Sequence, residues 1–427
     1  MITDLLSGLF LKLFIFLWPI AVTFFLGHIA WTLWKHYIKT EWISGIKWIV
    51  LEVKPPRDVL RSPKAMELFF TNALYQIAGK DKKSKYWKGA VRLWFSLEII
   101  SIDGQVHFYI RIPSRLKGLV ETQMYAQYPQ AQIVEVDDYT LAVPYVGGDS
   151  GFDFWGCEWK LTKSDVYPIK TYVDFGLDKD PKEEFKVDPM SPLIELFGSI
   201  QKGEQMWLQI VIRANDKKYH TAGTYFDEHD LLKEAQNEIT KITKDFTGVD
   251  ANNKSKDMKT APWQKDVVPA ITSKVTKLTF ETGIRLAYVA KKEDSNGNNK
   301  KNLRLIFRQY DTPHLNSFAR TNGSGLATFF QIFQGNRFFI SKKTRHTFTN
   351  AFFNAYRERA FFYMPLRQKK LPFPFSLFTF KYNQPNTFVL NTEELATLWH
   401  FPGQILKVPG LERVESKQAS PPPNLPI

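Results

Sequence analysis

The stretch VRLWFSLEIISIDGQVHFYIRI, residues 91–112, decides the fold class of this chain. Apolar side chains alternate with other residues on both sides of Asp103-Gly104, a dipeptide that favours a two-residue hairpin turn. Alternation with a period of two is typical of half-buried strands. The stretch therefore predicts an antiparallel hairpin, whose core-facing residues are Val91, Leu93, Phe95, Leu97 and Ile99 on one strand and Val106, Phe108, Ile110 and Ile112 on the other.

The flanking segments predict a βαββαβ order. Ile46–Val53 is apolar and β-branched, as in a strand, and Ser62 can cap a helix whose first residue is Pro63. Leu116–Gln127 predicts a second helix and Ala131–Val136 a closing strand. This order is the ferredoxin-like pattern, in which both helices pack on one face of the sheet.

The rest of the body predicts a second, decorated α+β domain with a weaker pattern. Gln205–Arg213 reads as a strand, and 227–246 as a charged amphipathic helix. The overall fold class expected is α+β. The expected divisions are a membrane anchor at 1–45, a ferredoxin-like domain at 46–140, a second domain at 150–336 with polar loops near 248–261 and 291–302, a basic, aromatic helical region and connector at 337–400, and a Pro-rich tail at 401–427.

The anchor is predicted from Leu13–Trp34, which runs for 22 positions without a charged residue. As a helix this segment is roughly 33 Å long, close to the hydrocarbon thickness of a bilayer. A cleaved signal peptide would have a shorter apolar run and small residues at its end, and a core helix is rarely apolar on every face. We therefore expect a retained span, with Trp31, Trp34 and Tyr37 at the membrane interface.

The distribution of lysines predicts the orientation of this span. Lys35, Lys39 and Lys47 follow it, whereas Asp4 and Lys12 precede it. Because positive residues stay on the cytoplasmic side, we expect the N-terminus outside and the body in the cytoplasm. Membrane lipid is therefore one expected partner.

The composition limits the function classes. Cys157 is the only cysteine, which excludes a disulfide scaffold and a cysteine metal cluster. The net charge of +14 favours contact with phosphates, in lipid head groups or in nucleic acid. Charge alone does not distinguish these two partners.

Motifs for catalysis are missing from the sequence. It contains no phosphate-binding loop, no Gly-x-Gly-x-x-Gly and no His-Glu-x-x-His. His314, His346 and His400 lack metal-ligand spacing, and the adjacent pair Asp137-Asp138 is more typical of a turn than of acid–base catalysis. We therefore expect a protein that is not an enzyme and holds no cofactor or metal.

A basic and aromatic stretch, residues 337–370, has two interpretations. Nine basic residues and seven phenylalanines are interleaved there with a single acid, Glu358. Such a mixture can follow a nucleic-acid strand by charge and stacking. It can equally form an amphipathic helix whose phenylalanines are core and whose charges are solvated. The candidate nucleic-acid or phosphate contacts are Arg337, Lys342, Lys343, Arg345, Arg357 and Arg359.

Several short motifs resemble a known group of membrane proteins. FVLNTEELATLWHFP at 388–402 and PPNLP at 422–426 are similar to the segment that precedes the motor core of type IV secretion-like coupling ATPases. These belong to the FtsK/HerA superfamily and occur in candidate-phylum bacteria. Further similarities are DPMSPLIELF at 188–197, GEQMWLQIVIR at 203–213, YAQYP at 125–129 and EVDDY at 135–139.

The resemblance implies a membrane-anchored region beside an ATP-driven motor. No motor sequence follows, so a split partner of a separate ATPase, a stand-alone relative and a truncated product all remain open. We expect a non-catalytic component of a conjugative DNA-transfer machine, oligomeric in the assembly, that positions a separate ATPase. The alternative is a membrane-tethered scaffold without a nucleic-acid role. The helix predicted from Asn391 would dock on a partner or on the body through Leu395, Leu398 and Trp399.

Overall fold

The structure is a computed structural model of the 427-residue chain. It describes residues 2–56, 61–77, 82–143, 150–178, 188–215, 218–220, 228–246, 262–321, 342–363, 387–403, 410 and 413. The described chain divides into two compact units. The first comprises Met1–Lys47 with Ala78–Arg92, and the second comprises Trp48–Ile77 with Leu93–Ile427.

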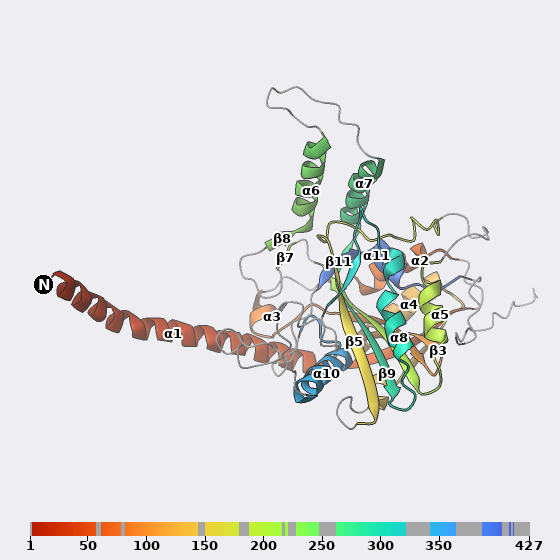
Figure 1. Ribbon diagram of the computed structural model, residues 1–427, viewed down its shortest axis with the longest axis horizontal. Helices are drawn as coiled ribbons and strands as arrows, with labels where there is room; N and C mark the ends of the chain where they lie inside the picture. Colours follow the sequence, from red (N-terminus) through yellow and green to blue (C-terminus); the bar gives the residue numbers. More distant parts are fainter. Residues whose placement is uncertain are drawn as a thin grey trace, which may run out of the picture. The chain divides into compact units, whose positions relative to one another are not determined.

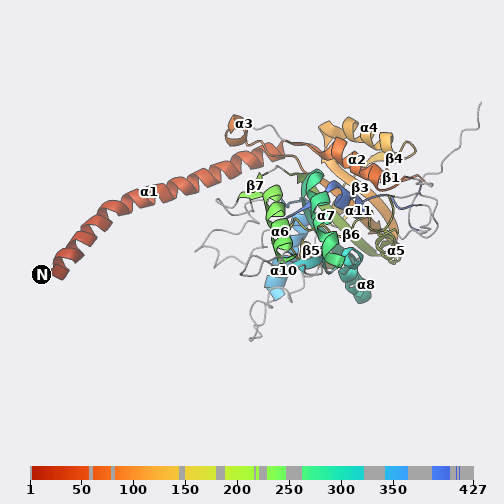
Figure 2. The same ribbon diagram turned by 90° about the horizontal axis from the view of Figure 1, so that it is seen from above.

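The first unit is built on one long helix, α1, Ile2–Ser44 (Figure 1). Its part from Ile15 to Ser44 is long and apolar enough to cross a membrane. A short helix, α3, Lys82–Tyr86, lies beside the C-terminal part of α1 (Figures 1 and 2). The apolar run predicted at 13–34 is thus helical throughout.

The second unit contains an antiparallel sheet in which nine described strands take part. Eight run in the order β10-β5-β9-β6-β2-β3-β1-β4, and β11 pairs with the start of β9. The strands are β1 Trp48–Lys54, β2 Phe95–Ile102, β3 Gln105–Pro113, β4 Gln132–Val136, β5 Phe152–Leu161, β6 Glu204–Ala214, β9 Thr279–Lys291, β10 Phe318–Thr321 and β11 Phe388–Asn391, with β7 Lys218–His220 and β8 Glu228–Asp230 in a separate ribbon.

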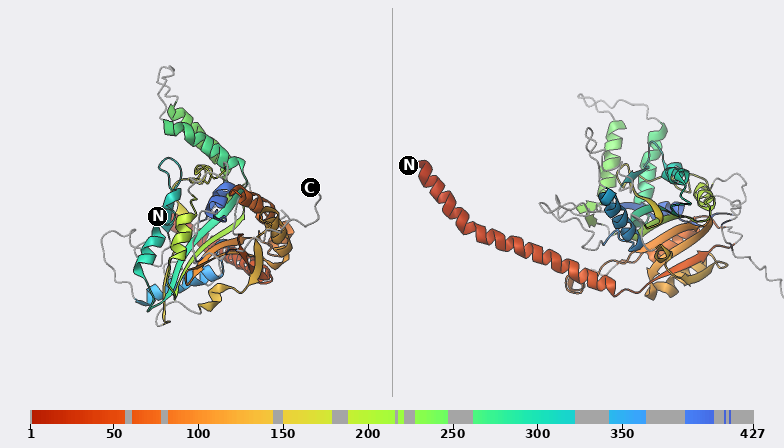
Figure 3. Two further views of the ribbon diagram at one scale, coloured as in Figure 1. Left: turned by 90° about the vertical axis from the view of Figure 1, so that its right-hand side faces the viewer. Right: turned by 60° about the horizontal axis from the view of Figure 1, so that its bottom comes forward.

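The helices of the second unit are mostly short. They are α2 Lys64–Phe69, which continues as a π-helical turn over Phe70–Leu74, α4 Lys117–Gln127, α5 Ser191–Gly198, α6 Leu231–Phe246, α7 Pro262–Thr276, α8 Gly297–Asn302, α10 Lys342–Arg357 and α11 Thr392–Leu398. The helices α6 and α7 follow β6 and precede β9 along the chain, and they run side by side (Figures 1 and 3).

The predicted hairpin is present as β2 and β3. Asp103 and Gly104 both have positive φ, 54° and 85°, as a type I′ turn requires. The register Ile102↔Gln105 places them as the two turn residues. The first strand begins at Phe95 rather than at Val91, so the alternating residues before Phe95 lie outside the ladder.

The two predicted domains share one sheet. In the first half of the unit, β2-β3-β1-β4 are neighbours and all their pairs are antiparallel. In the second half, β10-β5-β9-β6 are neighbours in the same way. β2 and β6 join the halves through eight residue pairs, Phe95↔Ile212 to Ile102↔Gln205. The predicted division between 46–140 and 150–336 therefore does not separate two bodies.

The two faces of the sheet differ. Helices α2, α4, α5, α8 and α11 cover one face, here called the helix face, where Phe108 of β3 meets Trp399 at the end of α11. Figure 2 shows α2 and α4 together over the first strands. The opposite face, here called the charged face, carries Glu98, Gln209 and Arg285, and α10 packs on it through Tyr356.

Two polar segments were predicted as loops. Residues 291–302 instead contain a turn and the helix α8, because Asn296 caps it by accepting a hydrogen bond from the Asn298 amide at 2.9 Å. The loop predicted at 248–261 lies outside the described residues. So does most of the 401–427 tail, of which 401–403, 410 and 413 are described.

The core of the first four strands can be tested at Phe95, whose side chain is 0% exposed. Phe95→Ala should lower the free energy of unfolding by ~3–5 kcal/mol, because it removes a buried ring and leaves a cavity. Urea denaturation of the detergent-solubilised full chain measures this loss. Tyr125→Ala, at a 40% exposed aromatic on α4, is the control and should change stability by less than ~1 kcal/mol. Equal effects of the two variants would contradict the assignment of this core.

Candidate functional site: a buried charge network on the sheet

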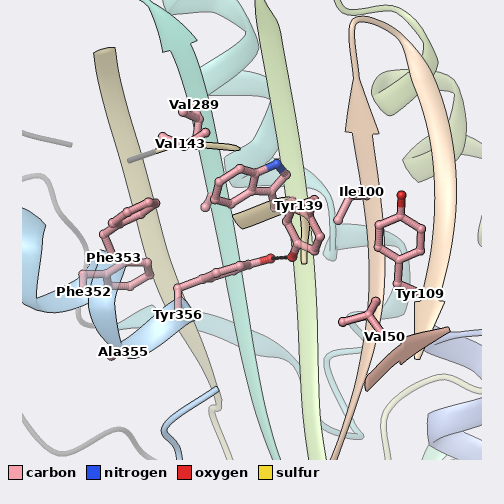
Figure 4. Packing of buried hydrophobic residues seen from close by; sticks show 12 residues of the cluster. Val50, Ile100, Tyr109, Tyr139, Val143, Val289, Phe352, Phe353, Ala355 and Tyr356 are labelled. Carbon is pink, nitrogen blue, oxygen red and sulfur yellow. Dashed lines mark hydrogen bonds between the residues drawn. The ribbon is translucent and has the colours of Figure 1, made fainter. Parts of the chain in front are cut away.

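Helix α10 brings the basic, aromatic stretch onto the charged face. Phe352, Phe353 and Tyr356 are buried against strand residues that include Trp207 and Val289 (Figure 4). The spacing of these residues places them on one side of the helix. The phenylalanines of this part of the stretch are therefore core residues, as the amphipathic-helix interpretation predicts.

Two glycines in the strands make room for this packing. A Cβ atom at Gly156 of β5 would collide with the Phe352 ring, and one at Gly283 of β9 would collide with the Phe361 ring. Glycine inside a strand often marks such a close approach. These two positions therefore form notches that accept one phenylalanine each.

The C-terminus of α10 turns sharply at Arg359. Its φ is 49°, in the left-handed region that usually takes glycine. The Ala360 amide donates to the Ala355 carbonyl at 2.9 Å and the Arg359 amide donates to the Tyr356 carbonyl at 3.0 Å, which is the Schellman pattern. A non-glycine residue there costs about 1–2 kcal/mol, so other contacts must hold Arg359 in place.

Those contacts are charged hydrogen bonds. The Arg359 guanidinium is 1% exposed and donates to both carboxylate oxygens of Glu98, at 2.9 and 3.1 Å. It also donates to both oxygens of Asp138, one of them at 3.1 Å, and to the Arg357 carbonyl at 2.8 Å. Bidentate pairs of this kind are the strongest hydrogen bonds that arginine makes.

Electrostatics keep Arg359 and Asp138 ionised. Burial alone would raise the pKa of Asp138, but the positive charge and hydrogen bonds of Arg359 outweigh it and hold the pKa below its usual value. Burial would lower the pKa of Arg359, whereas the negative charges of Glu98 and Asp138 raise it well above its usual value. Arg359 therefore stays protonated and Asp138 stays deprotonated at neutral pH.

A second arginine holds the same segment from the strand side. Arg285 of β9 donates to Glu158 at 2.9 Å and to the carbonyls of Ala355 and Ala360, at 3.0 and 2.9 Å. Its guanidinium also lies over the Phe361 ring, 3.8 Å from the centroid. Two arginines thus hold the end of α10 on the sheet: Arg285 of β9 and Arg359, which follows α10.

Neutral polar groups complete the network. Gln209 donates to the Tyr356 carbonyl at 3.1 Å, and the hydroxyls of Tyr139 and Tyr356 lie 2.9 Å apart (Figure 4). Burial, followed by the negative charge of Glu98, raises the pKa of both tyrosines well above the usual value. Both tyrosines therefore keep their hydroxyl protons at neutral pH and act as neutral hydrogen-bonding groups rather than as acids.

The candidate phosphate contacts have different positions. Arg337 lies outside the described residues. Lys342, Lys343 and Arg345 lie on α10, and the structure describes only their backbone. Arg357 is half-buried with its guanidinium 5.6 Å from the Phe353 ring centroid. Arg359 is corrected: its guanidinium is buried and bound to Glu98 and Asp138, so it does not contact a phosphate.

The candidate docking residues on α11 are also buried. Asn391 and Glu394 form the predicted capping box. Leu395, Leu398 and Trp399 are at most 1% exposed, and the Trp399 ring contacts the rings of Phe70 and Phe108. These three side chains therefore anchor α11 on the body, which is one of the two docking alternatives that the sequence left open.

Lysines that the sequence did not single out fix α11 further. Lys274 is fully buried and pairs with Glu394 at 3.1 Å. Lys277 bridges Glu67 at 3.0 Å and Glu393 at 2.6 Å. Lys274 lies in the last turn of α7 and Lys277 directly follows the helix. Neither lysine has a distinctive sequence context. Only the fold brings them to α11.

The segments that carry the resemblance contact one another. His400 lies 3.1 Å from the Asp188 carboxylate, so the "DP" segment meets the end of α11. Burial would raise the pKa of Asp188, but His400 and backbone amides hold it below the usual value. Asp138 of the Asp137-Asp138 pair caps the turn at Tyr139–Ala142, as a turn interpretation predicts. Among the described residues no group of His, Cys, Asp and Glu is arranged to hold a metal ion.

Comparison with known proteins places this architecture in a family. A family model described as a domain of unknown function, DUF8128, matches residues 40–325. The chain belongs to the DUF8128 family. The matched region runs from the end of α1 past β10 and so includes both halves of the sheet, whereas α10 and α11 lie beyond it. No curated protein matches the chain.

The Arg359 network predicts a large and non-additive effect on stability. Arg359→Met should lower the free energy of unfolding by ~3–5 kcal/mol, because it leaves the Glu98 carboxylate buried without its partner. The double variant Arg359→Met with Glu98→Gln should recover part of that loss. Arg357→Met, two residues away and half-buried, is the matched control and should cost less than ~1 kcal/mol. Additive losses in the double variant would show that the pair is not coupled.

The depressed pKa of Asp138 predicts a loss of stability in acid. The stabilisation is fully present above the unfolded pKa of about 4 and is lost as pH falls through the lower folded pKa. The denaturant concentration at the unfolding midpoint should therefore decrease as the pH is lowered below about 4. Asp138→Asn should flatten this decline, and Asp137→Asn, at the exposed neighbour, should leave it unchanged. An identical pH profile for Asp138→Asn and the natural chain would be evidence against the mechanism.

Proposed function

We propose that this chain is a membrane-anchored, non-catalytic assembly module of a conjugation-like DNA-transfer machine, in which it positions a separate ATPase beside the membrane. Its α1 helix serves as the anchor, with the N-terminus outside and the body in the cytoplasm. The sheet unit serves as a rigid platform. DNA is the cargo of the machine and is not held by the α10 segment.

One observation supports the non-catalytic, architectural part of this proposal: Arg359 binds carboxylates of the sheet unit. Within residues 349–363 of the basic, aromatic stretch, Phe352 packs on Gly156 and Phe361 packs on Gly283. The buried Arg359 of the same segment binds Glu98. A groove for nucleic acid needs exposed cations and exposed rings. The geometry therefore favours an architectural role for this segment.

The path of the C-terminal segment supports a positioning role. After α11, the chain returns to the β2–β3 hairpin, where the Gly410 carbonyl accepts a hydrogen bond from the Val106 amide at 2.7 Å. Arg413 donates to the Gly403 carbonyl at 3.3 Å. In the coupling ATPases that the chain resembles, the motor follows this segment. A partner held here would have a defined position on the platform.

We interpret the platform as two ferredoxin-like units joined edge to edge. In each half the second, third, first and fourth strands are neighbours, which is the order of a βαββαβ fold. The second half carries α6 and α7 between its second and third strands, where the first half has a two-residue turn. The joined edges are β2 and β6, and the pairing there gives the platform one continuous sheet.

The rival function is a membrane scaffold without any nucleic-acid role, and the burial of Arg359 agrees with it as well as with the proposal. Fluorescence anisotropy with the full chain in nanodiscs tests whether the α10 segment contacts DNA. We expect no DNA binding through the α10 segment, so that Arg357→Gln leaves any residual signal unchanged. Affinity that falls steeply with salt and is lost in Arg357→Gln would restore this segment as a DNA contact.

The orientation can be tested by labelling. Glu293→Cys places a thiol on an exposed residue of the body, and the natural Cys157 is buried. In intact cells an impermeant maleimide should label Glu293→Cys only after permeabilisation. Labelling without permeabilisation would place the body outside.

Partner positioning can be tested by site-specific photocrosslinking. Gln105 is exposed beside the residue that binds Gly410, so a benzoylphenylalanine there should crosslink to a FtsK/HerA-type ATPase encoded with this protein. The same group at Leu305, an exposed residue on the turn after α8, is the matched control and should not crosslink. Equal crosslinking at both positions, or none at Gln105, would contradict the proposal.

A further inference from the structure

We infer that the first unit contains a binding surface for anionic lipid head groups, formed by the segment 82–89 on the C-terminal part of α1. This surface is called the collar below. The inference rests on the proposed membrane anchor and goes beyond it, because it assigns a lipid class and a second chain segment to the membrane interface.

The collar is seated on the helix at two points. The rings of Tyr86 and Trp31 are stacked with centroids 6.3 Å apart. Three residues later, Gly89 lies against the backbone of Ile38, where any Cβ atom would collide with the Ile38 carbonyl oxygen. The φ of Gly89 is +66°, so glycine is also required by the backbone.

Between the two seats the collar makes a turn. The Trp87 amide donates to the Lys83 carbonyl and the Ala90 amide donates to the Ser84 carbonyl, both at 3.0 Å. These bonds close the loop that carries Trp87 and Lys88.

The collar presents aromatic rings at the end of the apolar run. Trp87 is 69% exposed and Tyr86 37%, and on α1 the rings of Trp34 and Tyr37 are exposed as well. Large exposed rings of this kind are costly in water but are favoured in the interfacial layer of a membrane. Their position at the C-terminal end of the uncharged run 13–34 is the position expected for rings at the depth of the lipid head groups.

The charge around these rings is strongly positive. Residues 31–47 and 78–92 together contain nine lysines and arginines and only two acids, Glu41 and Asp81. Lys83 and Lys88 of the collar are exposed, and Lys35 lies 5.9 Å from the Trp31 ring centroid. Clusters of four to eight basic residues next to a span attract anionic lipids. An anionic head group, such as that of phosphatidylglycerol, therefore fits this surface.

The test uses the full chain in nanodiscs with an environment-sensitive fluorophore on a single introduced cysteine, since Cys157 is buried. Trp87→Cys reports on the collar, and Phe24→Cys, at a 77% exposed residue in the apolar run, reports on the span. The discs contain phosphatidylcholine alone or phosphatidylcholine with phosphatidylglycerol. Spin labels on head groups or on acyl chains serve as quenchers.

We expect the Phe24 probe to be quenched by acyl-chain labels in both kinds of disc. The Trp87 probe should be quenched by head-group labels, more strongly with phosphatidylglycerol, and high salt should remove the difference. Replacing Lys82, Lys83, Lys85 and Lys88 by Gln should abolish the dependence on phosphatidylglycerol.

The seat of the collar has its own matched pair of variants. Gly89→Ala should detach the segment and reduce head-group quenching of the Trp87 probe without changing any charge. Gly45→Ala adds the same methyl group where it meets only ordinary contact with the Trp42 carbonyl, and should leave the quenching unchanged.

The outcomes separate the two proposals. If the Phe24 probe lies in the hydrocarbon but the Trp87 probe shows no contact with head groups, or contact that is indifferent to lipid charge, the collar is refuted and the anchor stands. If the Phe24 probe is not quenched by acyl-chain labels, the anchor fails, and the collar fails with it.

Discussion

The contact of Arg359 with Glu98 and Asp138 is the constraint on which the rest of the sheet unit depends. Arg359 and Glu98 are 261 residues apart, and their pairing fixes the end of α10 on the strand that joins the two halves of the sheet. Buried charges are costly, so this face is stable only while each charge has its partner. Once the pair is in place, the Tyr139–Tyr356 contact and the two glycine notches follow from the same docking.

The helix face is closed by a different balance of forces. There α11 contributes Leu395, Leu398 and Trp399 to the core, while Lys274 and Lys277 bind the glutamates of its first turn. The segments 188–197 and 388–402 meet at the Asp188–His400 contact. Their residue types are thus explained by packing and capping within this chain.

The basic residues named here have two kinds of surroundings. In the first unit, Lys83 and Lys88 are exposed beside exposed aromatic rings, where we propose that an anionic membrane surface neutralises them. In the sheet unit, Arg285 and Arg359 face inward and are neutralised by Glu158 and Glu98. A uniform reading of the chain as a phosphate-binding protein would miss this division, because composition does not record which way a side chain points.

The sequence by itself determined the features that depend on neighbouring residues. The apolar run of α1, the Asp103-Gly104 turn and the capping box at Asn391 are local, since their physics is complete within a few positions of the chain. The α+β class agrees with that local pattern. Only the tertiary structure decided that the two halves form one sheet and that Arg359 and Trp399 face the interior. A helical period shows that one face is apolar but not which surface it meets, and the partner carboxylate of Arg359 lies far away in the sequence. Gly156 and Gly283 were the residues in the sequence that could have indicated this packing. A glycine in a strand does not show by itself which ring packs on it, because Phe352 and Phe361 are brought there only by the fold.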